Sequence, residues 1–211
     1  MEDHEITQQS YDRLAKALRP ISGTGAITSQ LSQVLACASQ KDTVSYQEIK
    51  AIIEDDPGDL LLLADECRLL LSVSTAKSSS WEDRLLLLKE GERYEIPNII
   101  RYVVKKGIHS GRWDARKAVE SLFKDLEDPY WKTVPELVRS IQEEAVNHVI
   151  SSNQIKMICL QFGLSNRVDS LIAELKAAGI ISPRLASTPE VNRHGAPLYE
   201  LNPSVPMGGS K

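Results

Sequence analysis

The sequence predicts a mainly α-helical protein with two small β-hairpins, which is an α+β fold class. Three observations predict it. Apolar residues recur at three- and four-residue spacing through most of the chain, the period of an amphipathic helix. Two short stretches, residues 83–96 and 180–201, instead have a strand-like composition around turn residues. The order of helices followed by a hairpin occurs twice, so we expect two similar units.

The C-terminal stretch, residues 151–203, has the clearest pattern. Apolar residues predict a first helix over residues 153–162, and Gly163 ends it because glycine accepts the left-handed backbone of a helix end. Ser165 can cap a second helix, which runs to Gly179. The apolar positions are Ile155, Ile158, Cys159 and Phe162 in the first helix, and Leu164, Val168, Leu171, Ile172, Leu175 and Ala178 in the second.

A hairpin follows the second helix. Ile180 and Ile181 predict a short strand, which Pro183 limits in length. The alternation in PLYEL, residues 197–201, predicts the returning strand. The loop between the two strands contains proline, glycine and several small polar residues.

The run LSNRVDSLIAELKAAGIISP, residues 164–183, resembles the second helix and first wing strand of the winged helix-turn-helix superfamily. It looks like many bacterial and archaeal regulators, and it is similar to the DNA-binding gamma domain of bacterial chromosome translocases. The resemblance implies a winged-helix fold for this stretch. It also implies that the second helix enters the DNA major groove, as in helix-turn-helix proteins.

The same order of elements occurs earlier in the chain. A helix over residues 28–39, a capping box of Ser45 with Glu48 and a leucine-rich helix over residues 59–71 precede strands at 83–89 and 92–96. We therefore predict tandem winged-helix units. A second capping box, Thr133 with Glu136, opens the first helix of the C-terminal unit, residues 134–150.

Helical segments surround these units. A helix over residues 6–19 ends at Pro20 and precedes a flexible joint at 22–25. A helical bridge joins the units through a helix from Pro97 to Lys106, closed by Gly107, and another over residues 112–126. The predicted organisation is an N-terminal helix and joint at 1–25, a degenerate winged unit at 26–96, the bridge at 97–132, the C-terminal winged helix at 133–203 and a flexible tail at 204–211.

Composition and motifs narrow the functional classes. The 211 residues are 42% hydrophobic and 26% charged, which is ordinary for a soluble globular protein. No apolar run reaches the length of a membrane span, and the acidic, polar start is not a secretory signal. Three distant cysteines indicate a reducing cytoplasm. Scattered histidines and missing metal or nucleophile motifs predict no cofactor, no metal site and no enzyme.

Charge is unevenly distributed although the net charge is only −4. Residues 41–96 contain 7 basic and 13 acidic residues, a local charge of −6, whereas residues 97–124 contain 7 and 2, a local charge of +5. Phosphates attract basic surfaces, so DNA contact should involve the 97–124 segment and the C-terminal unit. In that segment the expected contacts are Arg112, Arg116 and Lys117.

The predicted DNA-binding surface is the start of the second C-terminal helix. Arginine can pair with guanine and asparagine with adenine, and we expect Arg167 to be exposed, opposite Val168 and Leu171. The expected base contacts are Ser165, Asn166, Arg167 and Ser170. Lys156 and Arg184 would hold phosphates, and Asn192, Arg193 and His194 would contact the backbone or minor groove from the wing.

Acidic residues support an alternative. Asp169 and Glu174 lie on the same C-terminal helix, and the 59–71 helix contains or adjoins Asp55, Asp56, Asp59, Asp65 and Glu66. Leucines nearly encircle the 59–71 helix, so it is buried or binds a protein partner.

Two functions therefore stay open. One is a cytoplasmic protein that binds duplex DNA, as a transcriptional regulator or a replication or segregation accessory. The other is a non-enzymatic adaptor of tandem winged helices, as in the winged-helix pairs of membrane-trafficking and chromosome-condensing complexes, which this chain resembles only in arrangement. No heptad run indicates a coiled-coil dimer, although a homodimer through another surface stays open.

Overall fold

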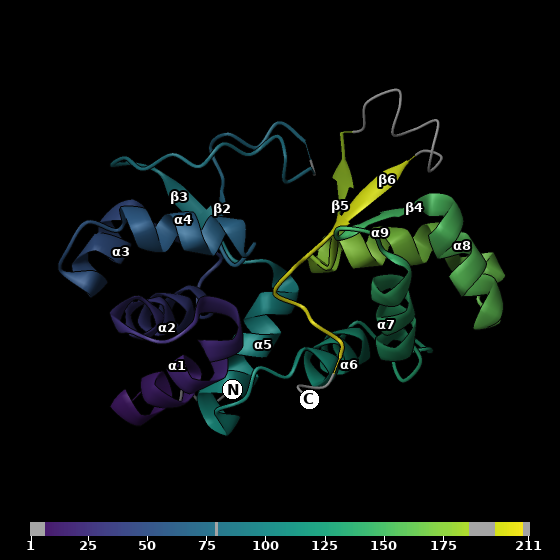
Figure 1. Ribbon diagram of the computed structural model, residues 1–211, viewed down its shortest axis with the longest axis horizontal. Helices are drawn as coiled ribbons and strands as arrows, with labels where there is room; N and C mark the ends of the chain where they lie inside the picture. Colours follow the sequence, from purple (N-terminus) through teal and green to yellow (C-terminus); the bar gives the residue numbers. More distant parts are fainter. Residues whose placement is uncertain (1–6, 79, 186–196, 209–211) are drawn as a thin grey trace. The chain divides into compact units, whose positions relative to one another are not determined.

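The computed structural model describes residues 7–78, 80–185 and 197–208 (Figure 1). It divides into two compact units. The first consists of residues 1–75 and 86–114, and the second of residues 76–85 and 115–211. The chain therefore passes between the units after residues 75, 85 and 114.

The first unit contains most of the N-terminal half of the chain. Its core includes fully buried Leu14, Leu35 and Ile99, contributed by α1, α2 and α5. Its helices and strands are α1 (Gln8–Ser22), α2 (Ala26–Ala38), β1 (Thr43–Ser45), α3 (Tyr46–Ile53), α4 (Gly58–Glu66), β2 (Leu71–Ser72), β3 (Arg93–Glu95) and α5 (Asn98–Ser110).

The second unit repeats much of this arrangement. Phe123, Leu137, Ile155 and Leu175 contribute to its core, and each is fully buried. Its elements are α6 (Ala115–Asp125), α7 (Val134–Glu144), β4 (Val149–Ser151), α8 (Ser152–Gln161), the short 3-10 helix η1 (Ser165–Arg167), α9 (Val168–Ala178), β5 (Ile181–Arg184) and β6 (Leu198–Leu201).

Both units have the topology of a winged helix. In each, a helix is followed by a strand, two helices and two further strands, and the last strand lies between the other two. The sheet orders are β1-β3-β2 and β4-β6-β5, with every pair antiparallel. The predicted α+β class, mainly helical with small antiparallel sheets, is confirmed, and both units share this order of elements.

The first strand of each sheet ends in a serine that caps the next helix. The Ser45 hydroxyl accepts a hydrogen bond from the Glu48 amide, and the Glu48 side chain accepts one from the Ser45 amide. Ser151 and Gln154 make the same capping box at the start of α8. The Ser45 box is as predicted, whereas the Ser151 box was not predicted.

The predicted first strand of the N-terminal hairpin, residues 83–89, is wrong. Its place is taken by Leu71–Ser72, which pairs with Tyr94 and Glu95 of β3. The helix predicted over 59–71 ends at Glu66, because Arg68 adopts a left-handed φ of 52° and turns the chain toward β2. Residues 76–85 belong to the second unit and do not join the sheet of the first unit.

The start and end of α7 also differ from the prediction. Thr133 has helical backbone angles and makes no side-chain cap, so the predicted box with Glu136 is wrong. The helix ends at Glu144 and does not reach residue 150. Asn147 and His148, with φ of 52° and 61°, form a tight turn that pairs Val146 with Val149 and leads into β4.

Two predicted helix ends lie inside helices. Pro20 falls within α1, which continues to Ser22, and Gly107 falls within α5, which continues to Ser110. A Cβ atom at Gly107 would lie 2.9 Å from Leu14 Cδ1, so this glycine permits the close approach of α1 to α5.

The predicted bridge over residues 97–132 is divided between the two units, with α5 in the first and α6 in the second. The second of its helices begins at Ala115, three residues later than predicted.

Candidate functional site

In the second unit, α9 and the short η1 turn before it lie where a winged helix has its recognition helix, and we use that name for the position only. Leu164, Leu171 and Leu175 anchor this segment in the core. Three polar side chains of this segment are exposed and therefore accessible to a ligand: Ser165, Asn166 and Ser170. The segment begins as a 3-10 turn without a side-chain cap, so the predicted capping role of Ser165 is wrong. The Ser170 hydroxyl donates to the Arg167 carbonyl at 3.0 Å and stabilises the turn.

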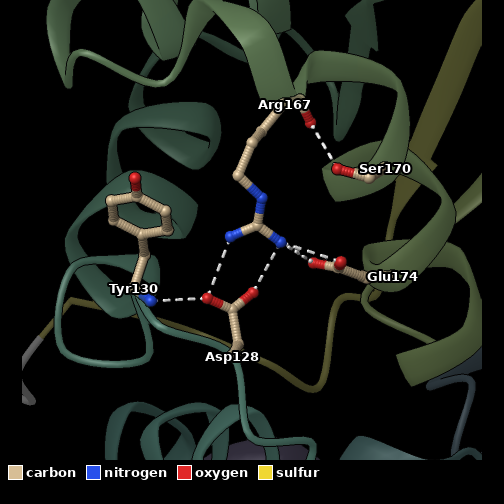
Figure 2. Close-up of polar contacts among 5 residues, drawn as sticks. All are labelled: Asp128, Tyr130, Arg167, Ser170 and Glu174. Carbon is tan, nitrogen blue, oxygen red and sulfur yellow. Dashed lines mark hydrogen bonds and ion pairs between the residues drawn. The ribbon is translucent and has the colours of Figure 1, made fainter.

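Arg167 lies at the centre of an ion-pair network (Figure 2). Its Nη1 and Nη2 donate to Oδ1 and Oδ2 of Asp128 at 3.0 and 2.8 Å, a bidentate pair. Nη2 also donates to both carboxylate oxygens of Glu174, at 2.9 and 3.1 Å. The guanidinium carbon lies 5.2 Å from the ring centroid of Tyr130, within range of a cation–π interaction.

Burial of this network is uneven. The Asp128 side chain is 3% exposed, that of Arg167 is 19% exposed and that of Glu174 is 30% exposed. Asp128 also accepts a hydrogen bond from the Tyr130 amide at 2.6 Å, so its carboxylate has three donors. The network fixes the start of the recognition helix against the turn that follows α6.

The pKa values of the two carboxylates, Asp128 and Glu174, are shifted in opposite directions. Burial acts to raise the pKa of Asp128, but hydrogen bonds from Arg167 and the Tyr130 amide outweigh it, so this pKa lies below its usual value. Burial raises the pKa of Glu174, and the nearby Asp128 charge raises it further, against the lowering effect of Arg167. Asp128 is therefore the principal partner of Arg167.

These contacts correct the expectation that Arg167 is exposed. Its guanidinium is engaged by two carboxylates and an aromatic ring, so it does not project toward a DNA base. Glu174, seven residues later, was visible in the sequence as a nearby acid. Asp128 lies 39 residues earlier in the chain, and no sequence pattern connects it to Arg167.

The other predicted phosphate contacts that the structure describes are divided between the two units, and two of them are paired with glutamates. Arg116 pairs with Glu136, and Arg184 Nε lies 3.5 Å from Glu82 Oε1. Lys156 is exposed on α8, and Lys117 is exposed on α6. Arg112 is exposed in the first unit, whereas Arg116 and Lys117 belong to the second. The predicted wing contacts Asn192, Arg193 and His194 lie outside the described residues.

The equivalent helix of the first unit, α4, has a different exposed side. Leu60, Leu61 and Ala64 are buried, so this helix is partly a core element. Asp59, Leu62 and Glu66 are exposed at three- and four-residue spacing, and therefore share one side of the helix. Leu62 is 49% exposed. We call Asp59, Leu62 and Glu66 the α4 face.

The α4 face adjoins further acidic residues. Asp55 and Asp56 are exposed in the turn before α4, and Asp56 Oδ1 accepts a hydrogen bond from the Gly58 amide at 3.0 Å. The leucine-rich helix was predicted to be buried or to bind a partner; Leu60 and Leu61 are buried, whereas Leu62 is exposed, so burial alone does not account for all of its leucines. An aliphatic side chain among carboxylates is chemically suited to a basic, partly apolar partner.

The described part of the chain contains no group of three or more His, Cys, Asp or Glu side chains arranged to hold a metal ion. Within residues 7–78, 80–185 and 197–208, no helix combines the length and apolar character needed to cross a membrane. A shallow depression between α7 and residues 201–206 is lined by Gln142, His148 and Asn202. The side-chain amides of Gln142 and Asn202 hydrogen-bond to nearby backbone groups, so these two residues hold the local structure together and are not free to bind a ligand. Val205 is fully buried and Met207 is 5% exposed, so the prediction of a flexible tail at 204–211 is wrong for these residues.

Comparison with known proteins gives one match. A family model matches residues 13–208, which include both winged units. No curated protein and no solved structure matches the chain.

Proposed function

We propose that the chain, which belongs to the protein family whose model covers residues 13–208, is a non-enzymatic adaptor that binds a partner protein through the α4 face. The observation that carries this proposal is the exposed Leu62 between Asp59 and Glu66 on a recognition helix. The same helix position in a DNA-binding unit would meet phosphates, which repel carboxylates.

The second unit supports the same proposal. The first two turns of α9 contain Asp169 and Glu174 and no arginine or lysine. The arginine just before them, Arg167, is held by Asp128 and Glu174. Both recognition helices therefore lack an available arginine near their N-terminal ends, which is the group most often used to contact guanine.

The chemistry of the α4 face defines the partner. Its carboxylates fit lysine or arginine side chains, and Leu62 fits an apolar side chain between them. An amphipathic helix with basic residues flanking an aliphatic or aromatic residue meets both requirements. Charge complementarity of this kind steers association and weakens as salt rises.

A capture experiment tests this proposal. The wild-type chain, Leu62→Glu and Leu126→Glu would be immobilised and exposed to extract from the source cells, with bound proteins quantified by mass spectrometry. Leu126 is the matched control, because it is 57% exposed and lies in the second unit. We expect a protein whose capture falls by at least about tenfold for Leu62→Glu only, as for loss of an interface hot spot. Equal capture of every protein by all three chains would reject the proposal that the α4 face binds a partner.

Duplex DNA binding is the second candidate function. One observation favours it: Ser165, Asn166 and Ser170 are exposed at the N-terminal end of the recognition region, with Lys156 exposed on the preceding helix. These residues can contact base edges and a phosphate without Arg167.

A gel-shift titration with random duplex at several salt concentrations tests the DNA candidate. If Lys156 contacts a phosphate, Lys156→Ala should reduce the slope of log affinity against log salt by about one. Lys50→Ala, an exposed change on α3 of the first unit, is the matched control. Absence of a shift for the wild type at micromolar protein and low salt would reject DNA binding and leave the adaptor function.

A further inference from the structure

Residues 80–85 are packed into the second unit, although the chain on either side of the 76–85 stretch belongs to the first. Trp81 is only 5% exposed and Ser80 is 2% exposed. An indole this well buried in a segment without regular secondary structure requires a receiving surface. The backbone amide of Trp81 is bound by Ser182 of β5 in the second unit.

Hydrogen bonds connect the segment to β5 in both directions. The Trp81 amide donates to the Ser182 hydroxyl at 2.8 Å, and Ser182 is itself 1% exposed. The Leu185 amide donates to Glu82 Oε2 at 2.7 Å. Arg184 Nε lies 3.5 Å from Glu82 Oε1 and adds an ion pair. The Trp81 amide of the segment is therefore matched by the Ser182 hydroxyl, which accepts, and the Glu82 carboxylate is matched by the Leu185 amide, which donates.

The segment has a defined shape of its own. The Arg84 amide donates to the Trp81 carbonyl at 3.0 Å and closes a turn. Ser80 accepts a hydrogen bond from the Glu82 amide at 3.3 Å, and Ser78 donates to Asp83. A peptide whose shape is fixed by internal hydrogen bonds loses less entropy when it binds.

The place of β5 in its sheet explains why a peptide can bind there. In the order β4-β6-β5, the strand β5 is at the edge and pairs with β6 on one side only. Edge strands have backbone groups that other segments can engage. The 80–85 segment engages β5 through side-chain acceptors, Ser182 and Glu82, and does not add a strand to the sheet.

We propose that the outer edge of β5 is a docking site for a short peptide containing a Trp-Glu pair, and that residues 80–85 occupy this site as a ligand built into the same chain. The indole supplies apolar burial. The glutamate binds the Leu185 amide and Arg184, and Ser182 receives the peptide backbone. The proposal is independent of the α4 face and of the adaptor function.

A binding experiment with intact chains tests the docking site. A fluorescently labelled synthetic peptide of residues 76–86 would be titrated against the wild type and against Trp81→Ala, with binding followed by anisotropy. In the wild type the tethered segment competes at an effective concentration on the order of millimolar. We expect Trp81→Ala to bind the peptide at least about tenfold more tightly than the wild type. A peptide with alanine in place of the tryptophan should bind neither chain.

Equal binding of the peptide to the two chains, or binding to neither, would overturn the proposal. Hydrogen exchange supplies a second test, which does not require the segment to leave the site. Glu82→Ala should accelerate exchange of the Leu185 amide by at least about tenfold, because that amide loses a charged acceptor. Glu90→Ala is the matched control, an exposed glutamate in the same β2–β3 connection but outside residues 76–85. Unchanged exchange at Leu185 in Glu82→Ala would also overturn the proposal.

Discussion

Arg167 shows at the scale of single residues how far a sequence can locate a site. The spacing of Leu171, Leu175 and Ala178 correctly predicts which side of α9 faces the core, whereas Val168 is only half-buried. The same spacing predicts nothing about polar side chains that arrive from other elements. Asp128 reaches Arg167 from the turn after α6, and this contact decides whether the arginine is available to a ligand. Helical periodicity therefore predicts position, whereas partners depend on tertiary structure.

The two carboxylates of the Arg167 network should differ in their effect on stability. We expect Asp128→Asn to lower the free energy of unfolding by about 1–3 kcal/mol at pH 7, because a buried charged hydrogen bond is lost. Glu174→Gln should cost less than Asp128→Asn, since the pKa of Glu174 is raised by burial and glutamine still bonds to Arg167. Urea unfolding of both variants measures the difference, with Asp169→Asn on the exposed side of α9 as control. Equal costs would contradict this ranking.

The pH dependence of these variants follows from the directions of the pKa shifts. The lowered pKa of Asp128 gives stability that is present above about pH 4 and is lost as the pH falls through the folded-state value. The raised pKa of Glu174 gives stability that is present below about pH 4.5 and is lost as the pH rises through its folded-state value. Glu174→Gln should remove the second effect and also change the first, because Glu174 contributes to the lowered pKa of Asp128.

At the scale of elements, the sequence predicts long helices better than short strands. Helices α2 and α9 lie close to their predicted positions because several turns of apolar periodicity define each of them, whereas the start of the eight-residue α3 is defined by its capping box. Strands β1 and β4 contain three residues each, too few for an alternation to be recognised. The leucine run at 85–88 favoured a strand, yet the hairpin strand is Leu71–Ser72. A two-residue strand is specified by its partner β3 and by burial, neither of which is visible in local sequence.

The matching capping boxes of α3 and α8 permit a prediction at this scale. Hydrogen bonds from Lys41 and from the amide and hydroxyl of Ser45 lower the pKa of Glu48 to about 2. The Ser45 box therefore stabilises α3 above about pH 4.5 and weakens as the pH falls toward 2, whereas the Ser151 box contains the non-titrating Gln154. Glu48→Gln should cost about 0.5–1 kcal/mol at pH 7, a modest value because Glu48 is partly exposed to solvent.

The reciprocal exchange, Gln154→Glu, is the matched control for this prediction. Hydrogen exchange of the α3 amides, measured from pH 5 to pH 2 and corrected for intrinsic rates, should show declining protection in the wild type and a flatter profile in Glu48→Gln. Gln154→Glu should give α8 the acid dependence that α3 has in the wild type. Identical pH profiles for α3 in the wild type and Glu48→Gln would show that the cap does not control the acid response.

At the scale of the whole molecule, the chain connectivity is the feature that sequence reasoning could not supply. Local sequence patterns predict that the chain is divided into consecutive units joined by a bridge. The structure instead places residues 76–85 in the second unit, between stretches that belong to the first. The burial of Trp81 and the hydrogen bonds of residues 81 and 82 to Ser182 and Leu185 mark this exchange, and these contacts are not predictable from neighbouring residues. The repeated winged topology, in contrast, followed from the order of elements.

This connectivity predicts coupled unfolding of the two units. Residues 71–72 and 93–95 form the hairpin strands of the first unit, and the connection between them is held at Trp81 in the second. Release of Trp81 from an unfolding second unit therefore loosens the connection between β2 and β3. We expect the wild type to unfold in urea as one cooperative transition, with the amides of Ile99 in α5 and Ile155 in α8 losing protection at the same midpoint.

Trp81→Ala should separate the two transitions. Truncation of a buried tryptophan costs about 3–5 kcal/mol, and that cost falls on the second unit, which contains Trp81. The Ile155 amide should then lose protection at lower urea than the Ile99 amide, as residue-resolved NMR can measure. Leu88→Ala is the matched control, since Leu88 is 43% exposed in the same connection and lies outside residues 76–85. If the Ile99 and Ile155 midpoints already differ in the wild type, or move down together in Trp81→Ala, then the docked segment does not set the cooperativity of the molecule.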